Sequence, residues 1–63
     1  MSGAGEGAAI RILFVEDHLS LREGTSHLLA AHPDLHIVGE AATAREAVDL
    51  ALQLQPDVIL LDL

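Results

Sequence analysis

The chain has 63 residues, of which 51% are hydrophobic and only one, Phe14, is aromatic. This length allows one small domain at most, with a core built from aliphatic side chains. Ten acidic residues face three arginines and no lysine, and the net charge of −7 disfavours direct binding of nucleic acid or of an anionic membrane surface. The absence of cysteine excludes disulfides and thiolate metal sites, and we expect a cytoplasmic protein. No apolar run is long enough to span a membrane.

Residues 1–9 are rich in glycine and alanine and lack the basic residue and apolar stretch of a signal peptide. We expect them to form a flexible leader. Residues 10–15 (IRILFV) are almost continuously apolar and rich in strand-forming types. This run is too short for an ordinary helix and predicts a strand that is covered on both faces.

Apolar residues recur at helical spacing after this strand, which predicts a first helix. Ser20 and Glu23 have the spacing of a capping box at its start, and Pro33 marks its end. Gly24 lies inside this helix and should cost about 1 kcal/mol relative to alanine. The prediction therefore rests on the periodicity and on the two end signals.

A second β-α-β pattern follows. Residues 37–41 form a short segment that is interrupted by a glycine, as in an edge strand. Thr43 and Glu46 form a second capping box ahead of residues with an apolar helical face, and Pro56 ends that helix. Residues 57–62 then form a third strand that is apolar on both faces.

The predicted order is β-α-β-α-β, an α/β fold with a parallel sheet. Because crossovers between parallel strands are right-handed, two strand orders remain, 1-2-3 and 2-1-3. The first strand is the most evenly apolar, whereas the second is the shortest and most broken. We therefore expect the order 2-1-3, with the first strand in the centre and the helices on opposite faces.

Acidic residues stand where two of these strands end. Glu16 and Asp17 follow the first strand and Asp62 follows the third, so the order 2-1-3 brings all three to one crevice. Two carboxylates about 5 Å apart repel by about 3 kcal/mol at an effective dielectric constant near 20, which favours binding of a cation such as Mg²⁺. Such a site suits phosphoryl transfer, with Asp62 as the nucleophile and the adjacent pair as the metal ligands. Alternatively, these residues are solvated loop positions, with Asp17 as a helix cap.

Four short motifs stand out in the chain. They are FVEDH at 14–18, REG at 22–24, VGEA at 38–41 and PDVILLDL at 56–63. With these motifs, residues 10–63 resemble the receiver domain of two-component response regulators, most closely the class with a LuxR-type (NarL/FixJ-like) helix-turn-helix output domain. The resemblance implies a partial flavodoxin-like fold with strand order 2-1-3.

The resemblance also implies roles for the acidic residues. Asp62 would accept a phosphoryl group from a sensor histidine kinase, and the metal ligands of Mg²⁺ would be Glu16, Asp17 and Asp62. Asp17 would bind the ion directly and Glu16 through water, where relatives have a paired acid. Two residues depart mildly from the family pattern. One is Glu16, and the other is Leu19, which stands where many relatives have proline. The protein would be a signalling phosphoacceptor and not an enzyme, although complete receivers catalyse their own phosphotransfer and dephosphorylation.

The family pattern has five strands, and residues 10–63 supply three. A Thr or Ser hydroxyl, a Lys and a backbone carbonyl that complete the phosphoryl site would lie beyond Leu63. We therefore expect an amino-terminal half of a receiver domain, truncated after the third strand, with weak Mg²⁺ affinity and little labelling by acetyl phosphate. Its partners would include the missing carboxy-terminal half and a helix-turn-helix DNA-binding domain, and a homodimer of the full-length protein stays open.

Two other functions remain open at this point. One is a docking or dimerisation module that works without phosphorylation. The other is a fragment of a Toprim-like Mg²⁺-dependent nucleic-acid enzyme, in which a strand-end glutamate and a later Asp-x-Asp bind the ion. Glu16 and Asp62 would match that pattern if an aspartate followed Leu63 directly.

The four histidines do not form a paired zinc site on one helix, because Pro33 breaks the helix between His32 and His36. We expect solvent-facing side chains at three of them, His27, His32 and His36. His18 differs because it follows the acidic pair directly. It either borders the crevice and tunes access to it or lies on the loop surface.

Overall fold

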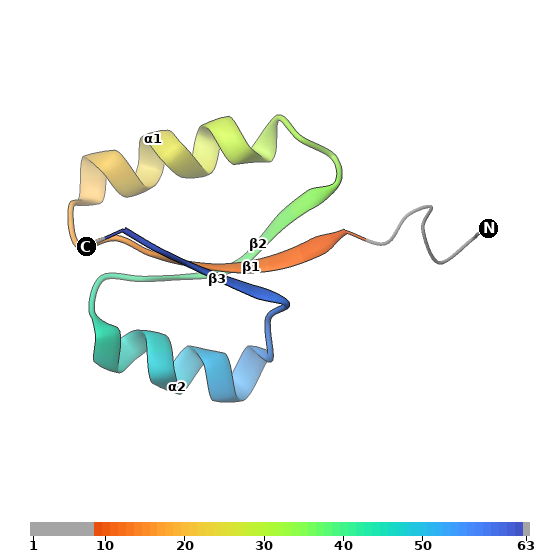
Figure 1. Cartoon of the computed structure of the whole chain (residues 1–63). Coiled ribbons are helices and arrows are strands. Elements are labelled where there is room, and N and C mark those ends of the chain that lie inside the picture. Colours follow the sequence, from red (N-terminus) through yellow and green to blue (C-terminus); the bar gives the residue numbers. More distant parts are fainter. Residues whose placement is uncertain (1–8, 63) are drawn as a thin grey trace.

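The computed structural model describes residues 9–62, so the leader expected over residues 1–9 lies outside the described part except for Ala9. One helix covers each face of a three-stranded sheet (Figure 1). No helix in residues 9–62 combines the length and the apolar character needed to cross a membrane. The elements in chain order are β1 (Ile10–Val15), α1 (Leu19–Ala30), β2 (Leu35–Ala41), α2 (Ala44–Leu54) and β3 (Val58–Leu61).

The strand order is β2-β1-β3 with all pairs parallel, which confirms the predicted topology. Ile12 of the central strand lies opposite Ile37 of β2 and Val58 of β3. The register with β2 shifts after this point, because Leu13 pairs with Gly39 and Val38 is passed over. The irregular edge strand predicted from the glycine is therefore confirmed. Strand β2 begins two residues earlier than expected, however, and with 7 residues it is the longest strand and not the shortest.

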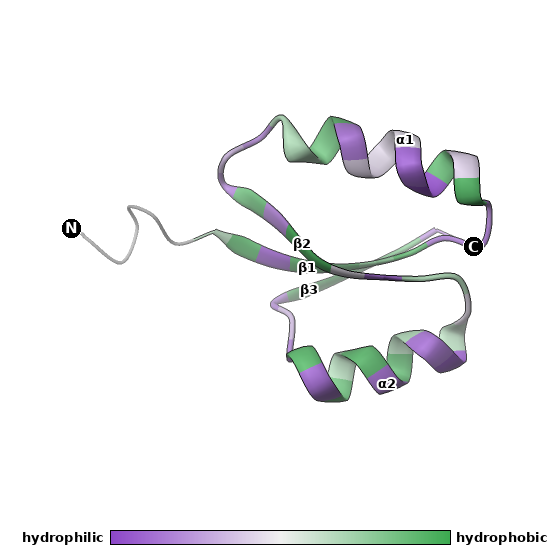
Figure 2. Cartoon of the chain, turned by 180° about the vertical axis from the view of Figure 1, so that it is seen from behind, coloured by the Kyte–Doolittle hydropathy of each residue, from purple (hydrophilic) through white to green (hydrophobic). Residues whose placement is uncertain are grey.

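The core lies along β1. Leu13, Phe14 and Val15 are almost completely buried because the central strand is covered by a helix on each face. On the α2 side, Leu13 and Val15 form a cluster with Ala41 and Ala47. Figure 2 shows apolar stretches in the strands, with hydrophilic bands in β1 and β2, and a mixture of apolar and polar residues in both helices. The almost continuous apolar pattern of residues 10–15 reflects burial of residues 12–15 on both sides of the sheet.

The second predicted capping box is present at the start of α2. The Thr43 hydroxyl accepts a hydrogen bond from the Glu46 N–H at 3.1 Å, and the Glu46 carboxylate accepts one from the Ala42 N–H at 2.9 Å. The second bond reaches one residue further back than in the usual motif. At the other end, Gln55 adopts a left-handed conformation with φ of 48°, and α2 ends before Pro56 as predicted.

The first predicted capping box is wrong. Helix α1 begins at Leu19 with His18 as its N-cap residue, and no side chain caps it. Ser20 therefore lies inside the first turn, where its hydroxyl cannot serve as the N-cap. The alternative of Asp17 as the cap is wrong for the same reason. The chain turns from β1 into α1 within three residues, which leaves no room for the longer connection that a cap at Ser20 requires.

Arg11 links the start of β1 to the end of α2. Its guanidinium donates to the main-chain oxygens of Leu54 and Gln55, each at 2.7 Å. Positive charge at a helix C-terminus satisfies carbonyls that have no partner within the helix. The main chains of Arg11 and Asp57 are also hydrogen-bonded, because the Asp57 N–H donates to the Arg11 oxygen at 2.8 Å. This hydrogen bond aligns β3 with β1.

Candidate metal centre

The carboxyl ends of the three strands lie at the same edge of the sheet, on the left in Figure 1, where the chain also leaves β1 towards α1. The Glu16 N–H donates to the Ala41 oxygen at 3.0 Å, and the Asp62 N–H donates to the Val15 oxygen at 2.9 Å. The main chain after β1 is therefore held by the end of β2, and the end of β3 is held by β1. The backbone positions of Glu16 and Asp62 are neighbours, as the strand order predicts.

Glu16 carries a buried carboxylate. Its side chain is only 3% exposed, and its Oε2 atom accepts the His18 N–H at 3.0 Å. The same oxygen lies 3.1 Å from Nδ1 of the His18 ring. Burial of a charge is costly without polar partners. The turn after β1 supplies such partners to this carboxylate through His18.

His18 bridges the acidic pair. Its Nδ1 atom lies 3.0 Å from Oδ1 of Asp17, and both side chains are more than half exposed. The hydrogen bond to Glu16, together with the negative charges of Asp17 and Glu16, raises the pKa of His18 above its usual range. The pKa of the Asp17 carboxyl is lowered, chiefly by hydrogen bonding with Glu16 and then by the charge of His18. A protonated His18 thus offsets part of the negative charge of the pair.

One compact group of metal-ligating atoms exists among residues 9–62. The ligand atoms of Glu16, Asp17 and His18 all lie within 4.8 Å of one another. Two carboxylates are a donor set that Mg²⁺ accepts, since the ion uses one or two carboxylates and keeps several waters. Asp62 is exposed and does not belong to this compact group, although its main chain lies beside Val15. Its role as a ligand and phosphoacceptor stays a prediction.

Arg22 supports the site in a way that the sequence did not reveal. Its Nη1 atom donates to the main-chain oxygen of Glu16 at 2.8 Å, and its Nε atom lies 3.3 Å from the Glu40 carboxylate. The side chain is only 17% exposed, so it fastens α1 to the ends of β1 and β2. An arginine in the first turn of the helix that follows an acidic pair is the signal that could have suggested this contact.

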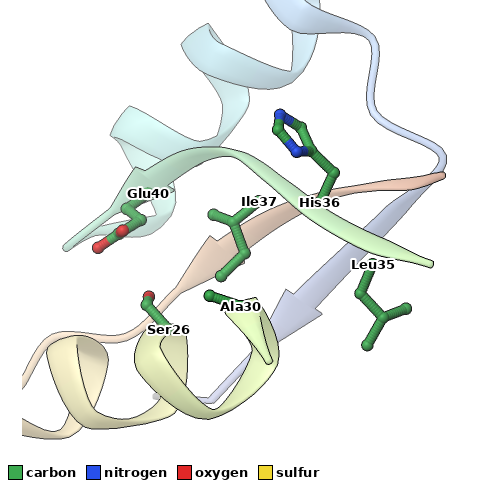
Figure 3. A pocket seen from close by; sticks show the side chains of 6 residues that line it. All are labelled: Ser26, Ala30, Leu35, His36, Ile37 and Glu40. Carbon is green, nitrogen blue, oxygen red and sulfur yellow. The ribbon is translucent and has the colours of Figure 1, made fainter. Parts of the chain in front are cut away.

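The larger of two described cavities lies away from the acidic group. It has a volume of about 360 Å³ and lies between α1 and β2. Ser26 and Ala30 of α1 line it opposite Ile37 of β2 (Figure 3). The Ser26 hydroxyl has no hydrogen-bond partner there. Asp17 and Asp62 are exposed at the strand ends, whereas the Glu16 side chain is buried.

Comparison with known proteins identifies relatives of the chain. No family model matches it. Transcriptional regulatory protein LiaR of Bacillus subtilis is 48% identical over 54 residues, which cover 86% of this chain and 26% of LiaR. Response regulator protein VraR of Staphylococcus epidermidis is 46% identical over 55 residues, which cover 87% of this chain and 26% of VraR. The chain therefore spans about a quarter of these relatives and is a homologue of response regulators, with the βαβαβ order of part of a receiver domain.

Proposed function

We propose that the chain is the phosphoacceptor part of a receiver domain in a two-component response regulator. The observation that carries this proposal is the position of Glu16 and Asp17 after β1, beside Asp62 after β3. The similarity to LiaR and VraR supports the family context. The same similarity favours this function over a Toprim-like enzyme, for which residues 9–62 offer no further support.

In the proposed reaction, a carboxylate oxygen of Asp62 attacks the phosphorus of a phosphohistidine on the kinase. The new O–P bond forms as the P–N bond breaks, and the imidazole of the kinase leaves with the bonding electron pair. Mg²⁺ bound by Glu16, Asp17 and Asp62 would neutralise charge on the phosphoryl oxygens. Arg22 holds the Glu16 main chain, and the buried Glu16 side chain fixes the turn that presents Asp17.

The proposal also covers partners and location. A sensor histidine kinase would supply the phosphoryl group in the cytoplasm, and the signal would control a helix-turn-helix DNA-binding domain outside these residues. The protein would act as a signalling phosphoacceptor and not on a separate substrate. The net charge of −7 agrees with DNA binding by a separate domain, because an acidic segment repels DNA phosphates.

Phosphate incorporation into a chimera tests the proposal. The 54 matching residues replace their counterparts in LiaR, and the folded chimera is incubated with radiolabelled acetyl phosphate and Mg²⁺. We expect labelling of the chimera, loss of labelling in Asp62→Asn, and normal labelling in Asp49→Asn, which removes an exposed carboxylate from α2. Retained labelling in Asp62→Asn would rule out the assigned acceptor. We expect little labelling of the 63-residue chain alone.

A second candidate is a docking or dimerisation module that works without phosphorylation. The four side chains of β3 are exposed, and an apolar cavity of about 330 Å³ lies between α2 and β3. Exposed apolar edges of this kind are typical of surfaces that pair with other chains. Asp62→Asn separates the two functions: it should stabilise the cation-free protein if Asp62 is repelled by the acidic pair, whereas an unchanged or lower free energy of unfolding favours the module.

A further inference from the structure

We propose that the cavity between α1 and β2 is a binding site for a small primary aliphatic amine in its protonated form. Its lining residues do not include Glu16, Asp17 or Asp62, so the inference goes beyond the proposed function and does not depend on it. The cavity combines an aliphatic wall, a buried hydroxyl without a partner and a carboxylate, and this combination decides the class of ligand.

The cavity is open because one face of α1 carries small side chains. Arg22, Ser26 and Ala30 follow one another at intervals of four residues and therefore lie on the same face of the helix. The long side chain of Arg22 reaches Glu40 of β2 at 3.3 Å. Ser26 and Ala30 are shorter and leave a volume of about 360 Å³ open opposite Ile37 (Figure 3). This volume lies near the lower end of the range for ligand pockets, which suits a small molecule.

The lining requires a ligand with an aliphatic part and a hydrogen-bond donor. Ala30, Leu35 and Ile37 supply apolar surface. The Ser26 hydroxyl oxygen is buried, has no hydrogen-bond partner and points towards the Glu40 side chain (Figure 3). A buried hydroxyl without a partner is costly, and a donor on a bound ligand removes this cost.

Glu40 makes a cation the preferred donor. Its side chain is 40% exposed, and its Oε1 atom lies 3.3 Å from Nε of Arg22. A carboxylate accepts several hydrogen bonds on its two oxygens, so this salt bridge leaves acceptor positions for a second cation. An ammonium group carries enough N–H donors for the carboxylate and the Ser26 hydroxyl together. An anion would be repelled by Glu40 and by the net charge of −7, and the His36 ring points to the other side of β2 (Figure 3).

NMR titration of the ¹⁵N-labelled 63-residue chain with isopentylamine tests the inference. The amine is protonated at neutral pH, as the lysine side chain is. We expect saturable shifts of the main-chain amide resonances of Ser26, Ala30 and Ile37. Isopentyl alcohol, which has the same aliphatic part and no charge, should bind at least about tenfold more weakly. Equal affinity for the two molecules would overturn the inference, as would the absence of saturable shifts at these residues.

Three variants test the individual groups. Glu40→Gln should weaken binding of isopentylamine by at least about tenfold, whereas Glu23→Gln, which changes an exposed carboxylate of α1 outside the cavity, should leave it unchanged. Ala30→Leu should abolish binding because it fills the cavity and keeps the salt bridge between Glu40 and Arg22. Circular dichroism checks that each variant is folded. Unchanged binding in Glu40→Gln or in Ala30→Leu would overturn the inference, and so would an equal loss in Glu23→Gln.

A last titration distinguishes a free amine from a lysine side chain, which carries the same group. We expect Nα-acetyl-lysinamide to bind more weakly than isopentylamine, because its amide groups do not fit beside the aliphatic wall. Tighter binding of the lysine derivative would overturn the assignment to a small amine in favour of a lysine of another protein. Failure of the amine site would leave the proposed function standing, since phosphate incorporation at Asp62 is measured independently.

Discussion

Two glycines show how single residues are constrained by their surroundings. A Cβ atom added at Gly39 would lie 2.7 Å from Cδ1 of Leu54 and 3.4 Å from Cδ1 of Leu13, whereas one at Gly24 would meet nothing within 4 Å. We expect Gly39→Ala to lower the free energy of unfolding by about 1–2 kcal/mol, because side chains in the core must shift. Gly24→Ala should raise it by about 1 kcal/mol through helix propensity. Urea denaturation measures both, and a loss of stability in Gly24→Ala would contradict this account.

His18 should make stability depend on pH when no divalent cation is present. Its pKa is raised in the folded protein by Glu16 and Asp17, so its protonated form stabilises the fold. This contribution is complete below the ordinary histidine pKa of 6.5 and is lost as the pH rises through the higher pKa of the folded state. Titration followed by NMR should show that the pKa of His18 lies above the ordinary value of 6.5. A midpoint at the ordinary value would show that the contacts with the acids are absent in solution.

The sequence predicted the positions of the acidic residues but not the contacts they make. Glu16, Asp17 and Asp62 could be placed at strand ends because each follows an apolar run of strand-forming residues. The contacts of His18 and Arg22 depend on rotamers and on the turn between β1 and α1, which no periodicity encodes. The sequence therefore left two positions open for His18, and the structure places its ring between the two carboxylates.

At the scale of elements, the two predicted capping boxes give a matched test. The Thr43 hydroxyl caps α2, whereas Ser20 lies inside α1 and caps nothing. We expect Thr43→Ala to lower the free energy of unfolding by about 1 kcal/mol. Ser20→Ala should leave it unchanged or raise it slightly, because alanine is the better helix former. A comparable loss in both variants, measured by thermal unfolding, would contradict the observed helix start.

The strands and α2 were more predictable than the start of α1. Strand β1 has the predicted bounds because a central strand is buried on both faces and reads as an unbroken apolar run. Helix α2 is fixed by strong signals at both ends, namely Thr43 with Glu46 at the start and Pro56 after the end. The predicted start of α1 was wrong because the prediction followed the local Ser20–Glu23 pattern. In the structure the connection from β1 is short, and α1 already begins at Leu19.

At the scale of the whole molecule, the strand order determines which residues meet. The order 2-1-3 followed from the right-handed crossover rule and from the apolar pattern, because the first strand was judged the most evenly apolar and the second the most broken. This order places the ends of β1 and β3 side by side and therefore brings two acidic segments to one edge. The sequence could not show whether the side chain of Asp62 turns towards Glu16 and Asp17, since the orientation of an exposed carboxylate depends on solvent and on bound ions.

The central claim is that acids from both strand ends share one cation. Titration of the 63-residue chain with Mg²⁺, compared between Asp62→Asn and Asp49→Asn, tests it most directly. Both variants remove one exposed carboxylate, but only Asp62 lies at the strand ends. We expect Asp62→Asn to weaken Mg²⁺ binding by at least about tenfold and Asp49→Asn to leave it nearly unchanged. Equal affinities in the two variants would contradict it.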